Sequence, residues 1–116
     1  MNKRVIDDYL QDMLDSIAAI EAFIEGISID DFKQDRKTIF AVTRAIEIIG
    51  ESVKNIPEPF RSKYPDVPWR AMAGMRDKLI HQYFRMDIDV LCKTTQQDVP
   101  QLKTLITRVI ELEKQG

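Results

Sequence analysis

The fold is decided by residues 35–55, which read DRKTIFAVTRAIEIIGESVKN. Apolar side chains recur there at spacings of three and four, as on one face of an α-helix, and this main stripe comprises Ile39, Val42, Ile46, Ile49 and Val53. Further apolar residues widen the stripe, namely Phe40, Ala41, Ala45 and Ile48. We therefore predict a helix from about Asp35 to Asn55, either central in a bundle or covered by a second subunit. Gly50 in its interior indicates that another backbone approaches closely.

The segments before this helix also have helical periodicity. An apolar stripe at helical spacing predicts a first helix from about Lys3 to Glu25, formed by Ile6, Leu10, Met13, Ile17, Ile20 and Ile24. Gly26 is a plausible stop for this helix. Ser28 then starts a short turn, with Asp31 three residues later as an imperfect capping box.

The segments after the central helix begin with a proline-rich stretch. Residues 57–68 hold four of the five prolines, which predicts an ordered loop. We expect Asp66 to cap a short helix that Gly74 interrupts, and a motif helix from about Met75 to Phe84. A last helix should follow a cap at Asp87 and end near Lys114, and the proline at position 100 should kink or split it.

Together these segments predict one domain over residues 1–116 with an all-α fold. We expect an up-and-down bundle of about four main helices, with the Pro-rich loop before the motif helix. No apolar run approaches the roughly 20 residues that span a bilayer, so no membrane association is expected. The early acidic residues argue against a signal peptide, and the single Cys92 cannot form an internal disulfide, so the cytoplasm is the expected compartment.

The charge is unevenly distributed along the chain. The net charge is -2, yet residues 33–85 hold eleven Lys and Arg against six Asp and Glu. The remainder holds six basic and thirteen acidic residues. Such a chain can present a basic surface to a polyanion while it is acidic overall. On charge alone, solvated helix faces of mixed sign are the simpler interpretation.

The segment most informative about chemistry is residues 75–84, MRDKLIHQYF, which contains the only histidine of the chain. On a straight helix Arg76 and Tyr83 would share a face, whereas His81 would lie about 140° from Arg76. A compact site therefore needs a distorted helix or a second copy of the motif. Taken singly, these residues could be a structural histidine, a salt-bridged arginine and a half-buried ring.

Taken together, these three side chains suit attack on an RNA phosphodiester without a metal. Imidazole transfers protons near neutral pH, and guanidinium binds phosphate in a forked geometry. The ribose 2′-hydroxyl would be the nucleophile, and two motifs across a two-fold axis would supply one imidazole for each proton transfer. One histidine and one cysteine cannot make a usual zinc site, so no metal and no cofactor are expected. Counting residues leaves a carboxylate-only magnesium site open.

The spacing Arg76-x4-His81-x-Tyr83 resembles the motif of the HEPN superfamily in its HepT-like toxins. Two further stretches resemble that family in the same order: AVTRAIEIIGE at residues 41–51 and YPDVPW at residues 64–69. The resemblance implies a homodimeric helical bundle that places two motifs in one cleft. It also implies a metal-independent endoribonuclease toxin, neutralised by an MntA-like minimal nucleotidyltransferase antitoxin that transfers AMP to Tyr83.

By position, the resemblance makes Arg76 and His81 the catalytic pair. Asp77, Tyr83 and Glu51 would support them, with Asp77 orienting Arg76 or His81 and Glu51 bracing Arg76. The candidate RNA-binding cations, which the sequence alone does not place on one surface, are Arg44, Lys54, Arg61, Lys63, Lys78 and Arg85. Two alternatives remain, a non-catalytic HEPN module that assists a nucleotidyltransferase and a plain interaction bundle.

Overall fold

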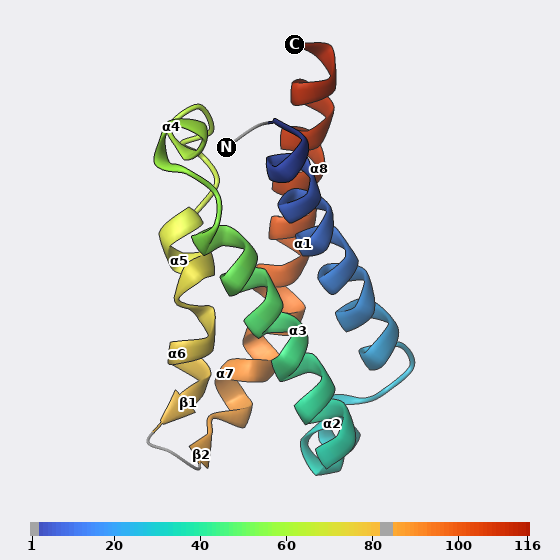
Figure 1. Cartoon of the computed structure of the whole chain (residues 1–116). Helices are drawn as coiled ribbons and strands as arrows, with labels where there is room; N and C mark the ends of the chain where they lie inside the picture. Colours follow the sequence, from blue (N-terminus) through green and yellow to red (C-terminus); the bar gives the residue numbers. More distant parts are fainter. Residues whose placement is uncertain (1–2, 82–84) are drawn as a thin grey trace.

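The computed structural model describes residues 3–81 and 85–116. Helices dominate this part of the chain, and the predicted all-α fold is confirmed (Figure 1). Among the described residues, none of the helices combines the length and the apolar character needed to cross a bilayer.

Two long helices form the frame of the bundle. Helix α1 spans Lys3–Ile24 and α3 spans Arg36–Lys54, within one residue of the predicted bounds. Between them lies α2, Ile29–Gln34, in place of the predicted turn, so that α3 runs back along α1 (Figure 1).

The ends of these helices have clear local causes. Gly26 has a φ of 74°, which an L-residue rarely adopts, and this ends the first helical run as predicted. The Ser28 hydroxyl accepts a hydrogen bond from the Asp31 amide at the start of α2. At the start of α3 the Asp35 carboxylate accepts hydrogen bonds from the Thr38 amide at 3.1 Å and the Thr38 hydroxyl at 2.8 Å.

The Pro-rich segment is ordered, as predicted, and contains the short helix α4, Glu58–Arg61. It leads to α5, Trp69–Ala73, whose N-cap is Pro68. The prediction that Asp66 caps this helix is wrong, because the helix begins at Trp69, too far along the chain for Asp66 to occupy the N-cap position. The Asp66 carboxylate instead lies 3.7 Å from the Arg108 guanidinium. The Trp69 indole N–H donates to the carbonyls of Arg61 and Tyr64, at 3.1 and 3.0 Å, and so fastens the loop to α5.

The motif segment departs from its prediction. Gly74 separates α5 from α6, Met75–Leu79, as expected. Helix α6 then stops, and β1, Ile80–His81, pairs antiparallel with β2, Arg85–Met86. The predicted continuation of the helix to Phe84 is therefore wrong, because the Ile80–Met86 and His81–Arg85 pairs require an extended backbone. Residues 82–84 lie outside the described part of the chain.

The C-terminal segment is split, as predicted. Asp87 caps α7, Ile88–Lys93, by accepting a hydrogen bond from the Val90 amide. A π-helical stretch, Thr94–Asp98, precedes α8, Val99–Gln115. Pro100 lies in the first turn of α8, where its missing N–H costs least. The change of helix type therefore falls immediately before the first turn that holds the proline.

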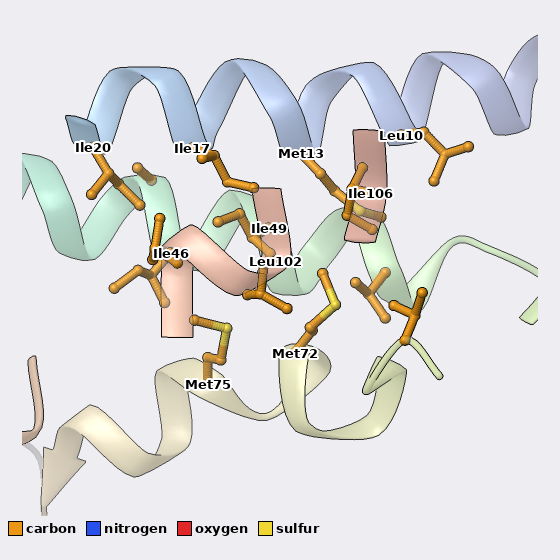
Figure 2. Close-up of a cluster of buried hydrophobic side chains, with 14 of the residues drawn as sticks. Leu10, Met13, Ile17, Ile20, Ile46, Ile49, Met72, Met75, Leu102 and Ile106 are labelled. Carbon is orange, nitrogen blue, oxygen red and sulfur yellow. The ribbon is translucent and has the colours of Figure 1, made fainter. Parts of the chain in front are cut away.

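The core is one apolar cluster between the helices (Figure 2). Side chains from α1, α3, the α5–α6 segment and α8 converge there, among them Leu10, Met13, Ile17, Ile20, Ile46, Ile49, Met72, Met75, Leu102 and Ile106. The predicted stripes of α1 and α3 supply ten of the 23 buried apolar side chains that the structure describes in this cluster. Because Met72 and Met75 anchor both sides of Gly74, core packing fixes the start of the motif segment against α3 and α8.

Candidate functional site

Arg76 lies in the first turn of α6, in an open groove between α3 and the α5–α6 segment. This Arg76 groove has a volume of about 340 Å³ and is lined by Glu47, Gly50, Glu51, Lys54, Ala73, Arg76 and Asp77. The Arg76 side chain is 53% exposed. Its guanidinium is therefore accessible to a ligand in the groove.

Two carboxylates hold Arg76 loosely. Its Nε lies 3.7 Å from Glu47 Oε1, and its Nη1 lies 3.9 Å from Asp77 Oδ1. Both distances exceed those of ordinary hydrogen bonds, so these are ion pairs without close donor–acceptor contact. The guanidinium is thus oriented by charge, and its N–H groups remain suited to a forked contact with phosphate. Asp77 was expected to orient Arg76 or His81, and this role stays a prediction.

Glu51, predicted to brace Arg76, pairs with a different cation. Its Oε1 lies 3.3 Å from Nη1 of Arg44, and the same Nη1 lies 3.4 Å from Glu47 Oε2. Glu47 is therefore the carboxylate that links Arg44 to Arg76, and sequence reasoning did not single it out. The predicted RNA-binding residue Arg44 is already paired with two carboxylates.

Gly50 sets the distance between α3 and the motif segment. A Cβ at this position would lie 3.2 Å from the Ala73 carbonyl oxygen and 3.4 Å from the Met72 carbonyl oxygen. The predicted close approach of a second backbone at Gly50 is confirmed. Since Ala73 precedes Arg76 by three residues, this contact seats the start of α6 against the carboxylates of α3.

The other predicted cations do not all share this groove. Lys54 lines it, whereas Lys78 lines a separate groove between α4 and α6. Arg85 belongs to β2, and its side chain is not among those the structure describes. The Arg76 groove holds two cations and three carboxylates, so within the described part of the chain it is not itself a basic surface.

Of the other two motif residues, the structure describes only the backbone of His81. The backbone of His81 lies in β1 and pairs with Arg85, but its side chain is not described, and Tyr83 lies outside the described residues. Helix α6 ends between Arg76 and His81, so the angle of 140° expected from a straight helix does not apply. A compact site formed by a distorted helix and one formed with a second copy of the motif both stay predictions.

Sequence reasoning also missed Arg70. It lines the groove that contains Lys78, together with Gly74. Positions 70, 74 and 78 are four apart, a spacing that places residues on one helical face. This signal was present in the sequence, but the expected interruption at Gly74 obscured it.

Comparison with known proteins gives a consistent family. The model of the family described as "Ribonuclease HepT-like" matches residues 13–109. A protein of Thermococcus cleftensis named "Probable ribonuclease HepT" is 54% identical over 101 residues, which are 87% of this chain and 92% of that protein. A protein of Methanocaldococcus jannaschii named "Putative RNase MJ0127" is 43% identical over 100 residues, 86% of this chain and 83% of that protein.

A third relative extends the match to another organism. A protein of Caldanaerobacter subterraneus subsp. tengcongensis named "Putative RNase TTE0752" is 40% identical over 106 residues, 91% of this chain and 95% of that protein. No solved structure matches the chain with significance. The family match, the relatives and the motif around Arg76 agree, and the chain belongs to the HepT-like ribonuclease family.

Proposed function

We propose that this chain is a metal-independent endoribonuclease that acts as a homodimer in the cytoplasm, as the toxin of a toxin–antitoxin pair. The observation that carries the proposal is an exposed Arg76, oriented by Glu47 without a close hydrogen bond, at the start of the motif that continues to His81. The names of the relatives as ribonucleases support RNA as the substrate.

The proposed reaction is an internal transesterification followed by hydrolysis. The ribose 2′-oxygen attacks phosphorus and loses its proton to one imidazole, while the bond from phosphorus to the 5′-oxygen breaks. A second imidazole donates a proton to the departing 5′-oxygen, and a 2′,3′-cyclic phosphate remains. Water then opens this ring to a 2′- or 3′-phosphate. Arg76 holds the non-bridging oxygens and offsets the charge that develops on them.

The homodimer follows from the number of proton transfers in this reaction. Two proton transfers are needed at opposite sides of the phosphate, and the chain has one histidine. A two-fold arrangement of two motifs provides His81 from each copy, one as the base and one as the acid. The same arrangement would bring a second Arg76 to the phosphate.

We propose that Tyr83 is the point of neutralisation by an MntA-like minimal nucleotidyltransferase. The Tyr83 oxygen would attack the α-phosphorus of ATP, and pyrophosphate would leave. Each added AMP brings a negative charge and bulk into the cleft that must receive an RNA phosphate. Mass spectrometry after incubation with the transferase and ATP should find the adduct on Tyr83, and Tyr83→Phe should abolish it. An unchanged yield of adduct in Tyr83→Phe would refute this assignment.

The ribonuclease proposal is tested by RNA cleavage in EDTA. The wild-type protein should produce cyclic or 2′/3′-phosphate ends, and His81→Ala should lose at least about 10²-fold of its rate with an unchanged circular dichroism spectrum. Gln97→Ala, an exposed residue of the π-helical stretch, is the control and should cleave normally. Cleavage that persists in His81→Ala would eliminate the mechanism. RNA binding without cleavage would instead support the non-catalytic binding module.

A further inference from the structure

A second groove lies on the side of α6 away from α3 (Figure 1). It runs between the Pro-rich loop and the outer face of the α5–α6 segment, and its volume is about 810 Å³. We call it the α4–α6 groove; the residues that matter for the argument are Glu58, Arg61, Pro68, Trp69, Arg70 and Lys78. Lys78 joins it to the motif, because this residue lies between Arg76 and His81 in the chain.

The cations of this groove are not neutralised. Among the described residues, no carboxylate forms an ion pair with Arg61, Arg70 or Lys78. Glu58 is the groove's carboxylate, and it accepts a hydrogen bond from the Ser62 hydroxyl at 3.2 Å. The balance is therefore three cations to one anion, in contrast to the Arg76 groove, where carboxylates outnumber cations.

The groove combines these cations with an apolar floor. Prolines and small apolar side chains line it beside the nearly buried Trp69, the floor residues being Pro65, Val67, Pro68 and Ala71. Cations along an apolar groove suit a single-stranded nucleic acid, whose phosphates need positive charge and whose unpaired bases need apolar contact. A protein partner of low charge would gain nothing from the three cations.

The walls of the groove are held in place before any ligand binds. The Arg61 Nε donates to the Ile56 carbonyl at 2.8 Å, which fixes one cation. The Trp69 indole ties the loop to α5 through two carbonyls. At the outer edge, Lys63 and Tyr64 both bind the Glu113 carboxylate of α8. The Pro-rich loop and Arg61 therefore have little conformational freedom left to lose on binding, which favours affinity.

We propose that the α4–α6 groove binds the single-stranded RNA that flanks the cleaved linkage, with its phosphates against Arg61, Arg70 and Lys78. The inference rests on the proposed ribonuclease function, which it deepens. It assigns the affinity for the RNA backbone to cations outside the Arg76 groove, since that groove has too many carboxylates to attract a polyanion.

Binding can be measured apart from cleavage with a fluorescent 2′-O-methyl oligoribonucleotide, which lacks the nucleophile. Arg70→Gln should weaken binding about two- to fivefold at low salt, and the slope of log affinity against log salt should become shallower by about 0.7. Glu58→Gln should have the opposite effect and tighten binding about twofold. This variant retains an oxygen for Ser62, and damage to the fold cannot produce tighter binding.

The matched control is Arg36→Gln, which removes the same charge at the start of α3, far from the groove (Figure 1). It should bind like the wild-type protein. Equal affinity in Arg70→Gln and Arg36→Gln, or weaker binding in Glu58→Gln, would overturn the inference. Displacement of the oligonucleotide by AMP, with no gain in affinity for longer oligonucleotides, would also overturn it and identify a mononucleotide pocket.

The two proposals fail separately. If Arg70→Gln and Glu58→Gln shift binding as expected but no RNA is cleaved, the groove assignment stands and the ribonuclease mechanism fails. If cleavage depends on His81 but neither variant changes oligonucleotide binding, the mechanism stands and the groove assignment fails.

Discussion

Replacing Gly50 by alanine tests whether the contact between α3 and α5 positions the site. In an unconstrained helix interior, Gly→Ala stabilises by about 1 kcal/mol. Here the new methyl group would lie 3.2 Å from the Ala73 carbonyl oxygen and 3.4 Å from that of Met72. Both atoms belong to backbone and cannot rotate away, so α5 must yield by a few tenths of an ångström to admit the methyl group.

The gain in helix propensity and the steric cost of the methyl group have opposite signs and can be compared. Overpacking of this kind costs about 1–3 kcal/mol, which equals or exceeds the gain of about 1 kcal/mol in helix propensity. We therefore expect Gly50→Ala to lower the free energy of unfolding by roughly 1 kcal/mol, and Gly50→Val to lower it further. Because Ala73 lies just before the motif, the rate of RNA cleavage should fall even where the protein remains folded.

Urea unfolding followed by circular dichroism measures the stability, and cleavage at saturating RNA measures kcat. The pair Gly50→Ala and Gly50→Val serves as its own control, since valine adds bulk at the same atom. A gain of about 1 kcal/mol in Gly50→Ala with unchanged kcat would refute the reasoning. It would mean that α5 moves freely relative to α3 and that the position of Arg76 does not depend on this contact.

Two further predictions concern Tyr64 and Glu47. Burial, followed by the hydrogen bond and the charge of Glu113, raises the pKa of Tyr64 from 10.0 to about 12. The folded state therefore holds the proton of the Tyr64 hydroxyl more tightly than the unfolded state does. The contribution to the free energy of unfolding is present below pH 10 and is lost as the pH rises towards about 12. Urea unfolding should show this loss in the wild-type protein and not in Tyr64→Phe. Glu47→Gln removes the charge that pairs with Arg76 and should lower kcat for RNA cleavage more than Glu51→Gln does, because Glu51 contacts Arg44 instead. Equal losses of kcat in the two variants would mean that Glu47 acts only through its charge.

The sequence predicts the long helices well because their burial is periodic. The stripes that end in Ile24 and Val53 each lie on one face, and one helix can bury such a face without further information. Gly50 was equally informative, since a glycine in the middle of a long helix usually marks the close approach of another backbone. The bounds of α1 and α3 therefore agree with the prediction within one residue.

The motif segment could not be predicted in the same way. Ile80 and His81 continue a plausible helical pattern, and what ends the helix is pairing with Arg85 and Met86. Each of these strands has only two residues, which is too short for an alternating pattern to reveal it. The cap predicted for the short helix after the loop failed for another reason: Asp66 is a good cap by type, but the helix begins only at Trp69, and a partner on a distant helix binds the Asp66 carboxylate.

The sequence could not show which carboxylate contacts Arg76, because side-chain rotamers decide this. Glu47 and Glu51 are one turn apart on α3, and both line the Arg76 groove. From the sequence either could reach the guanidinium. The structure distinguishes them because Arg44 occupies Glu51 and leaves one oxygen of Glu47 for Arg76.

The contact of Lys63 and Tyr64 with Glu113 ties the last turns of α8 to the Pro-rich loop, although they are remote from the motif in sequence. A truncation that removes Glu113 would therefore act on this loop rather than on an inert tail. Assays of this protein are best made with the whole of α8 intact.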